Sequence, residues 1–338
     1  MNEFTLVWLQ FGICAALIGY AGTRLAHYGD VIADKTGWSS SWVGLILLAT
    51  VTSLPELSTG VSSVALAGAP NIAVGDVLGS CLFNLSILAL ADLLYRPDSL
   101  YRRASHGHIL SAAFGVVLIS LVGLGLLLGD KSSPLTLGHV GIFAALSALL
   151  YLVAIRTVFS YEALNLQKST EKKSGRYQHL SLRQAVTGYA LAALVVVGAG
   201  VWLPFIATRL AELMGWHNTF VGTLFVAVAT SLPELAVTIS AVRMGALDMA
   251  IANVLGSNLF NILILAIDDL FFLRGPILAH VSPAHAVTAF SAVIMSGIVI
   301  IGLLVRPVAR PLRAVSWISM ALFAVFIVNF FVLYTFGQ

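Results

Sequence analysis

The sequence predicts an all-α polytopic membrane protein, with ten transmembrane helices forming two inverted five-helix repeats. Three observations lead to this fold class. The composition is too apolar for a soluble protein, ten apolar segments are long enough to cross a bilayer, and two polar motifs each occur twice, once on either side of a polar connector. Together they exclude a soluble globular enzyme and a disordered chain.

The composition is the first of these observations. Of the 338 residues, 59% are hydrophobic and 10% are charged, against roughly 25% charged residues in an ordinary soluble protein. Cys14 and Cys81 both lie in apolar stretches, so they offer neither a disulfide framework nor metal-ligand spacing. The only early charge is the acidic Glu3, whereas a cleavable signal peptide begins with basic residues. We therefore expect the first apolar stretch to span the membrane.

Ten segments meet the length of about 20 mostly apolar residues that a spanning helix needs. The predicted spans are residues 6–26, 42–66, 71–94, 108–129, 136–159, 184–211, 219–243, 247–272, 281–305 and 311–336. They are expected to be helices because backbone in lipid must satisfy its own hydrogen bonds. One long polar connector, residues 161–183, divides the chain into a first repeat, residues 1–160, and a second repeat, residues 184–338.

The basic residues predict the orientation, since cytoplasmic loops carry an excess of Lys and Arg. With the N-terminus outside, the inner segments hold 15 of the 18 Lys and Arg residues and the outer segments hold 3. This asymmetry predicts a multi-pass protein of the cell membrane with both termini outside. The connector at residues 161–183 would then be cytoplasmic.

The two halves carry matching signature blocks, residues 42–92 and 220–269. Aligning residues 42–67 on 220–245 gives 11 identities in 26 positions, and aligning 71–92 on 248–269 gives 12 in 22. Five spans per half is an odd number, so the second copy enters the membrane from the opposite side. Inverted repeats of this kind are common in secondary transporters, where they place substrate sites near the bilayer midplane.

The first motif of each block is Thr-Ser-Leu-Pro-Glu inside an apolar span. Proline removes a helical hydrogen bond and frees a carbonyl, and irregular backbone at membrane depth is tolerated where it lines a cavity. Carbonyl, hydroxyl and carboxylate oxygens are ligands for hard cations such as Ca²⁺. The candidate ligands from this motif are Thr52, Ser53, Glu56, Thr230, Ser231 and Glu234, with the carbonyls of Ala49 and Ala227 one turn earlier.

The second motif adds polar residues at helical spacing. The further candidate ligands are Ser80, Asn84, Ser257, Asn261 and Asp76. A carboxylate at the centre of a spanning helix costs about 2.5–3.5 kcal/mol on insertion scales, and neither glutamate has a basic residue at its depth in its own span. Bound cations or protons are therefore expected to neutralise Glu56 and Glu234.

Other features carry less information. Asp92 and Asp269 occupy equivalent positions near span ends, and Asp268 adjoins the latter. We interpret these residues as interfacial, with a part in ion entry as the alternative. The sequence contains no P-loop for ATP-driven transport. We expect no cofactor and no nucleic-acid partner. The partners are the lipid bilayer and small cations. We expect the protein to function as a monomer, and we expect neither an enzyme nor a channel.

At these motifs the chain resembles the cation/calcium exchanger superfamily, in its sodium/calcium exchanger branch. The family's signatures read roughly G-T-S-x-P-E and G-N-x-x-G-S-N-x-x-[ND], and both halves here contain T-S-L-P-E and V-L-G-S. The resemblance implies a central site with Na⁺ and Ca²⁺ positions, in which Glu56 and Glu234 are the principal carboxylate ligands. It also implies that the first and sixth helices slide across a core of the other eight.

Several positions depart from the family pattern. Val51 and Ala229 replace the glycine before Thr-Ser, Cys81 replaces an asparagine, and Asp76 stands where the family usually has asparagine. The leading hypothesis is Na⁺/Ca²⁺ antiport by alternating access at a midplane site. The alternative is an H⁺-coupled exchanger for Ca²⁺, Mn²⁺ or Mg²⁺ on the same scaffold, which Asp76 favours because it adds a third carboxylate.

Overall fold

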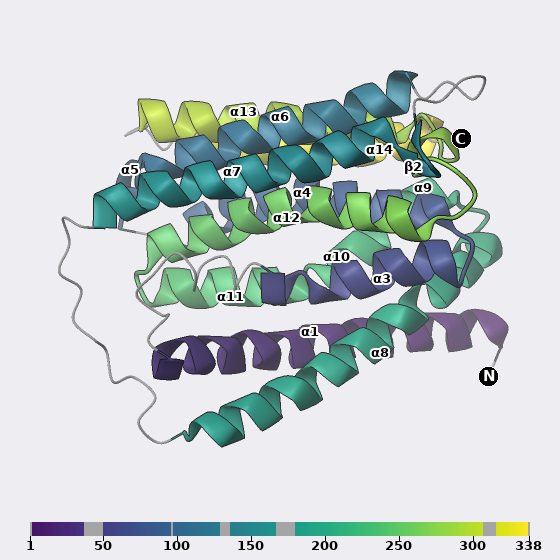
Figure 1. Cartoon of the computed structure of the whole chain (residues 1–338), viewed down its shortest axis with the longest axis horizontal. Coiled ribbons are helices and arrows are strands. Elements are labelled where there is room, and N and C mark those ends of the chain that lie inside the picture. The colour runs from purple at the N-terminus through teal and green to yellow at the C-terminus, as the bar shows by residue number, and fades with distance from the viewer. Residues whose placement is uncertain are drawn as a thin grey trace.

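The computed structural model describes residues 2–36, 50–95, 97–128, 136–166, 180–306 and 316–336. These segments are almost entirely helical, and the long helices run side by side (Figure 1). In this part of the chain, eight helices are long and apolar enough to cross a membrane, and one bent helix pair adds a ninth candidate. The prediction of an all-α polytopic protein is confirmed, while the count of ten spans stays a prediction.

The first half contains six described helices and one hairpin. They are α1 (Glu3–Thr36), α3 (Leu54–Ala65), α4 (Pro70–Leu94), α5 (Leu100–Arg103), α6 (Gly107–Leu128), β1 (Thr136–Leu137), β2 (Val140–Gly141) and α7 (Ile142–Leu166). The predicted span at 136–159 is wrong at its start, because residues 136–141 form a two-stranded antiparallel hairpin and the helix begins at Ile142. Gly138 has φ 69°, a left-handed conformation that turns the chain before the helix begins.

The second half has the corresponding long helices, with different short elements between them. They are α8 (Leu182–Met214), α9 (Asn218–Val221), the π-helix η1 (Gly222–Val226), α10 (Ala227–Thr230), α11 (Leu232–Arg243), α12 (Leu247–Phe271), the 3₁₀-helix η2 (Ile277–Ala279), α13 (His285–Val305) and α14 (Trp317–Phe336). A capping box between Ser181 and Gln184 starts α8, and Gly215 in a left-handed conformation ends it. These local signals explain why α8 extends a few residues beyond its predicted span.

The helices form layers around a central pair, α4 and α12, whose side chains are mostly buried. Helices α6, α7, α13 and α14 lie on one side of this pair, and α1 and α8 pack together on the other, beyond α3 and α11 (Figure 1). α1 begins and α14 ends at the same end of the bundle (Figure 1). Such an arrangement requires an even number of crossings.

The α1–α8 layer contacts the broken helices through glycine. A Cβ atom at Gly22 of α1 would overlap Pro233 of α11, and one at Gly200 of α8 would overlap Ser58 of α3 and approach the carbonyl of Pro55. Gly22 aligns with Gly200, and Pro55 aligns with Pro233. Each long helix therefore approaches the proline break of the opposite half, at equivalent positions.

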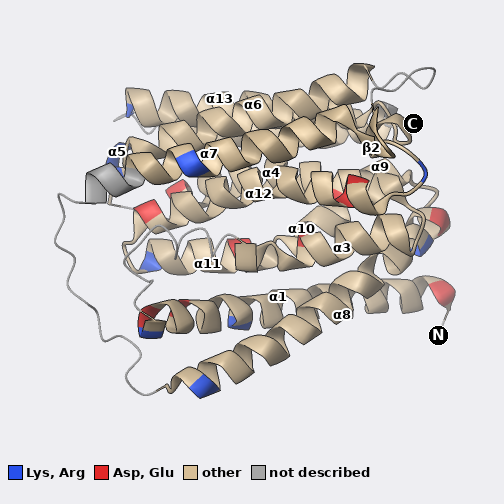
Figure 2. Cartoon of the chain, viewed as in Figure 1, with Lys and Arg blue, Asp and Glu red and all other residues tan. Residues whose placement is uncertain are grey.

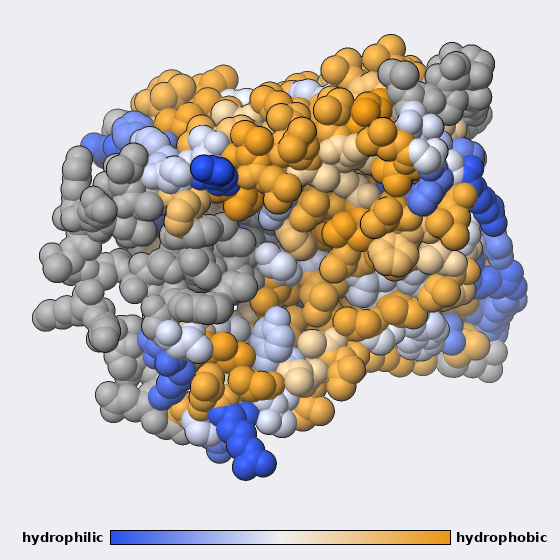
Figure 3. Space-filling model, in the orientation of Figure 1, coloured by the Kyte–Doolittle hydropathy of each residue, from blue (hydrophilic) through white to orange (hydrophobic). Residues whose placement is uncertain are grey.

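Charge and hydropathy follow the membrane geometry that the sequence predicts. Lys and Arg residues gather mainly toward the two ends of the bundle, while some Asp and Glu residues also lie along its middle (Figure 2). Between the ends, the visible face is a broad hydrophobic band (Figure 3). The described ion pairs include Arg209 with Glu3 and with Glu212, all well exposed. These ion pairs lie at the surface, so they do not neutralise the acidic side chains in the middle of the bundle.

Asp92 and Asp269 are buried anchors for neighbouring turns, which corrects their interpretation as interfacial residues. Asp92, at the end of α4, accepts hydrogen bonds from the Leu100 backbone at 2.8 Å and from the Ser316 hydroxyl at 2.7 Å. Asp269, at the end of α12, accepts from the Ile277 backbone at 2.5 Å and the Gly141 backbone at 2.7 Å. Each carboxylate thus fixes the next turn of its own half and the start of a helix from the other half.

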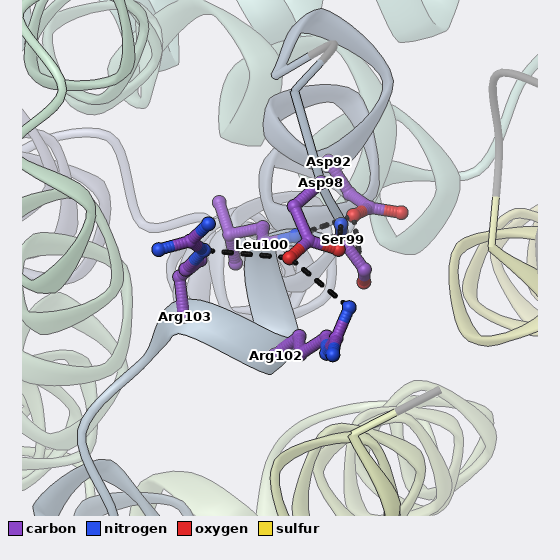
Figure 4. Close-up of polar contacts among 6 residues, drawn as sticks. All are labelled: Asp92, Asp98, Ser99, Leu100, Arg102 and Arg103. Carbon is purple, nitrogen blue, oxygen red and sulfur yellow. Dashed lines mark hydrogen bonds and ion pairs between the residues drawn. The ribbon is translucent and has the colours of Figure 1, made fainter. Parts of the chain in front are cut away.

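The turn after α4 contains a second acidic residue, Asp98, which pairs with arginines rather than holding a buried turn (Figure 4). Partial burial alone would raise the pKa of Asp98. The Ser99 backbone N–H and the neighbouring Arg102 and Arg103 together have a larger, opposite effect, so the pKa of Asp98 lies below its ordinary value. Its carboxylate lies 3.5 Å from Arg102 and 3.3 Å from Arg103. Asp98 therefore stays ionised as part of the charged end of the bundle, whereas Asp92 behind it holds the buried turn.

The starts of α4 and α12 are also anchored alike. Asn71 accepts from the Ser282 backbone at 2.7 Å and lies 3.2 Å from His285 Nε2. Asp248 accepts from the Ser105 backbone at 2.7 Å and lies 2.9 Å from His108 Nε2. The aligned residues make the same contacts at opposite ends of the bundle.

Candidate functional site

The candidate site is built around two helix breaks. α3 and α11 each begin with Leu-Pro, directly after Ser53 and Ser231. The two serines have nearly identical backbone angles, φ −88° and ψ 14° at Ser53 and φ −87° and ψ 11° at Ser231. Proline cannot donate to the carbonyl four residues before it, which explains why both helices break here. The second break bends its span by 46°.

The breaks bring the two glutamates and two serines together across the halves. Ser53 donates to Glu234 Oε1 at 3.0 Å, and Ser231 donates to Glu56 Oε1 at 2.9 Å. All four side chains are fully buried. Residues separated by more than 170 positions in the sequence therefore form two reciprocal hydrogen bonds at the centre of the bundle.

The central helices complete a ring of oxygen atoms. Ser80 of α4 lies 3.5 Å from Glu56 Oε1, and Ser257 of α12 lies 3.4 Å from Glu234 Oε1. The hydroxyls of Thr52 and Ser257 are 3.4 Å apart, and those of Thr230 and Ser80 are also 3.4 Å apart. The predicted hydroxyl ligands from both motifs thus converge on the two glutamates.

Asp76 joins this ring, but its counterpart Asn253 does not. Thr230 donates to Asp76 Oδ1 at 2.8 Å. Asn253 donates instead to the Thr238 hydroxyl at 3.1 Å and to the Glu234 carbonyl at 3.3 Å. The ring is therefore nearly symmetric in its hydroxyls and glutamates, and asymmetric in its third carboxylate.

The remaining predicted ligands fall into three groups. Asn84 and Asn261 are fully buried one turn beyond Ser80 and Ser257. The Ala227 carbonyl accepts from the Ser231 backbone at 3.1 Å, so the break does not free it completely. Ala49 lies outside the described residues.

Sequence reasoning missed one residue beside the ring. Asn258 accepts from Asn84 Nδ2 at 3.1 Å and donates to the Cys81 carbonyl at 3.1 Å. It aligns with Cys81, which the sequence comparison noted only as a departure from the family pattern. The sequence did contain a signal for Asn258, because an asparagine in one repeat and a cysteine at the aligned position of the other cannot make the same contacts.

The carboxylates retain free oxygen atoms. Within the described residues, Glu56 Oε2, Glu234 Oε2 and Asp76 Oδ2 are buried without a hydrogen-bond partner. Leaving a buried charged oxygen unpartnered is costly, and none of the described ion pairs brings Lys, Arg or His to these groups. A cation or proton would remove that cost.

The donor set suits a hard cation. Carboxylate, hydroxyl, amide and carbonyl oxygens surround the centre, which is the ligand chemistry of Na⁺ and Ca²⁺ rather than of thiophilic metals. In the described part of the chain, no three His, Cys, Asp or Glu side chains converge on a single point. A cation here would therefore be held in large part by neutral oxygens, with the carboxylates distributed around them.

Comparison with known proteins gives a consistent result. The model of the sodium/calcium exchanger protein family matches residues 6–161 and 184–334. The sodium/calcium exchanger MaX1 of Methanosarcina acetivorans is 28% identical over 270 residues, covering 72% of this chain and 77% of its own. The inner membrane protein YrbG of Escherichia coli is 27% identical over 248 residues, covering 73% of this chain and 74% of its own.

Solved structures share the fold at low identity. The sodium-calcium exchanger NCX_Mj superposes with a TM-score of 0.60 at 22% identity, covering 97% of this chain and 98% of its own. The H⁺/Ca²⁺ exchanger CAX superposes with a TM-score of 0.71 at 15% identity, covering 96% and 82%. These likenesses describe the fold, whereas the family match extends over most of the sequence. This chain is a multi-pass membrane protein that belongs to the sodium/calcium exchanger protein family.

Proposed function

We propose that this chain is a secondary-active antiporter that exchanges Ca²⁺ for Na⁺ by alternating access at the central ring. The observation that carries the proposal is the reciprocal pairing of Ser53 with Glu234 and Ser231 with Glu56. Each glutamate uses one oxygen in this pairing and keeps the other without a described hydrogen-bond partner. Two such carboxylates match the charge of one Ca²⁺ or of two Na⁺, so the two ions would compete for overlapping ligands.

The ligands in this proposal are the predicted set. They are Glu56, Glu234, Thr52, Ser53, Thr230, Ser231, Ser80, Asn84, Ser257, Asn261, Asp76 and the carbonyls of Ala49 and Ala227. The contacts between these hydroxyls and glutamates support it for most members. The Ala49 carbonyl is included through its alignment with Ala227.

The architecture that we propose is ten spans in two inverted repeats. Equivalent contacts support the repeat, because Asp92 and Asp269 each accept from a backbone N–H eight positions later. The shared end of α1 and α14 supports an even number of crossings (Figure 1). We place both termini outside, the connector at residues 161–183 in the cytoplasm, and one chain as the functional unit.

Proton coupling is the second candidate function, and Asp76 favours it. This carboxylate lies in the ring with one oxygen bonded to Thr230 and the other without a described partner. A group of this kind can hold a proton when no cation is bound. Exchange of H⁺ for Ca²⁺, Mn²⁺ or Mg²⁺ would then use the same ring.

Reconstitution separates the two candidates. Purified protein in liposomes is loaded with ⁴⁵Ca²⁺, and efflux is measured under an inward Na⁺ gradient, an inward H⁺ gradient or an inward K⁺ gradient, each at zero membrane potential. We expect efflux with Na⁺ alone. Efflux driven by H⁺ and not by Na⁺ would reject Na⁺ coupling in favour of the second candidate, and efflux with none of the three would reject both.

A further inference from the structure

A stripe of polar residues continues from the central ring along one face of α3. Glu56, Thr59, Gly60 and Ser63 follow one another at three- and four-residue spacing, which places them on the same face of a helix. All are buried. The hydroxyls of Thr59 and Ser63 have no hydrogen-bond partner among the described residues, although a helical hydroxyl can bond the carbonyl four residues before it.

Asp268 of α12 faces this stripe. Its side chain is fully buried, and both of its carboxylate oxygens lack a hydrogen-bond partner among the described residues. The carboxylate rests against Gly60, where a Cβ atom would overlap both of its oxygens. The glycine thus provides the space that the carboxylate occupies.

The groups around Asp268 add negative charge. Asp76 of α4 and the neighbouring Asp269 are both near enough to interact with it electrostatically. Asp269 is already bonded to the backbones of Ile277 and Gly141. A buried carboxyl group beside other carboxylates needs either a bound cation or a proton to neutralise its charge.

The aligned positions in the other half lack these features. Val237 and Ala241 stand where the first half has Thr59 and Ser63, and Ala91 stands where the second half has Asp268. Thr238, which aligns with Gly60, accepts a hydrogen bond from Asn253. The fold therefore does not require a carboxylate and two unpartnered hydroxyls here, since the other repeat has neither.

The polar stripe lies between the ring and the end of the bundle that holds the termini. α3 runs from its proline break toward that end, and Asp268 lies in the last turn of α12 at the same end (Figure 1). An ion that moved between the ring and that end along α3 would pass Asp268. Toward the opposite end, the position of α4 that aligns with Asp268 is the uncharged Ala91.

We propose that Asp268, with the hydroxyls of Thr59 and Ser63, binds one Na⁺ between the central ring and the outer end of the bundle. One carboxylate balances one monovalent charge, and hydroxyl oxygens are suitable additional ligands for Na⁺. The unpartnered atoms on α3 and α12 are the ligands, and Gly60 leaves the carboxylate room between them. This inference rests on the antiport function proposed above and adds a Na⁺ position outside the shared ring.

Binding measurements on the purified full-length protein test this position directly. ²²Na⁺ and ⁴⁵Ca²⁺ binding are measured at equilibrium for the wild type and for Asp268→Asn, which keeps the side-chain shape. We expect the variant to bind about one Na⁺ fewer per chain at a Na⁺ concentration of about ten times the wild-type Kd, because affinity at this position falls by about 100-fold or more. Ca²⁺ affinity should stay within about twofold, because Ca²⁺ binds in the ring.

Two further variants keep the test decisive. Glu212→Gln removes an exposed acidic group from the same end and should leave Na⁺ binding unchanged. The double variant Thr59→Val with Ser63→Ala leaves Asp268 in place and should weaken binding at this position by about threefold to tenfold, since it removes two neutral ligands. It provides the measurement if Asp268→Asn does not fold.

The outcomes distinguish this inference from the antiport proposal. Wild-type Na⁺ binding in Asp268→Asn, or in the double variant if Asp268→Asn is unfolded, would overturn the Na⁺ position and leave the ring untouched. Unchanged Na⁺ binding with a shifted pH profile of transport would assign a proton to Asp268 and reject Na⁺. Loss of one Na⁺ in a protein that shows no Na⁺-driven Ca²⁺ flux would support the position while rejecting the antiport proposal.

Discussion

The two central helices, α4 and α12, are the same sequence block used twice, and they agree most closely at their ends. Asp92 and Asp269 each accept from a backbone N–H eight residues later and from the residue just before a helix of the other half. Asn71 and Asp248 likewise each hold a turn and a histidine. These contacts join one half to the other, so both halves need them.

The same helices differ in the middle. Asp76 accepts from Thr230 inside the ring, whereas Asn253 donates to Thr238 and to the Glu234 carbonyl. A single pair of aligned positions thus gives one half an extra carboxylate and the other an additional backbone contact. The comparison teaches that the ends make the same contacts in both halves, while the middle is where the halves differ in charge and in hydrogen bonding.

The largest effect is expected at the two glutamates of the central ring, which both halves contribute. Glu56→Gln and Glu234→Gln should each reduce Ca²⁺ flux by about 100-fold or more, because removing one charge from a buried charged site costs about 3–5 kcal/mol. Flux into proteoliposomes measures this, with Asp98→Asn at the exposed end as the control. Retention of wild-type flux by either variant would remove that glutamate from the ligand set.

A large effect on stability is expected at the ends. Asp92→Ala should lower the free energy of unfolding by about 3 kcal/mol and Asp269→Ala by about 2 kcal/mol, since each removes hydrogen bonds to a buried charged acceptor and Asp92 accepts more of them. Thermal unfolding of the purified protein in detergent measures both. Asp92→Asn keeps one acceptor oxygen and should lose less. Equal stability of Asp92→Ala and the wild type would contradict its role as an anchor.

A moderate effect is expected at the position where the two helices differ. Asp76→Asn makes α4 resemble α12 and removes a group for which protons compete with cations, so inhibition of Ca²⁺ flux by external acid should weaken by up to about tenfold. The measurement is flux across about pH 6 to 9. Asn253→Asp is the matched control, because its new carboxylate faces Thr238. An unchanged pH profile in Asp76→Asn would remove the case for proton coupling at this residue.

The smallest effect is expected at the helix starts. Asp248→Asn converts one anchor into the form that Asn71 already has, and the Asp248 side chain is 61% exposed. Exposed pairs contribute little, so the loss should be about 0.5 kcal/mol. The same thermal unfolding measurement applies. A loss as large as that of Asp92→Ala would show that the two helix starts are not interchangeable.

Much of the fold could be predicted from the sequence because its signals are local. Apolar length gave α4, α6 and α12 nearly to the residue, and Pro55 and Pro233 marked the breaks. The hairpin before α7 was missed, because residues 136–141 are apolar enough to extend a span and only Gly138 signals a turn. Hydropathy cannot distinguish a short hairpin from the first turn of a helix.

The site was predicted by type more readily than by contact. Motif spacing identified Ser53 and Glu56 as neighbours on one chain segment, but the structure pairs Ser53 with Glu234 of the other half. Spacing along one helix carries no information about crossing contacts. Asn258 was missed for the same reason, since its partner lies on α4, and Asp268 was noted only beside Asp269, without its contact on α3.

The glycine contacts of α1 and α8 have a thermodynamic consequence. Gly22 meets Pro233 and Gly200 meets Ser58 beside Pro55, so the two long helices press on the breaks through surfaces without side chains. If these helices slide, pseudo-twofold symmetry relates the two end positions, and their energies should be close. At the breaks, the empty carrier would then favour neither end position strongly. Its own energies affect how the two positions are populated, while the electrochemical gradients set the direction of net flux.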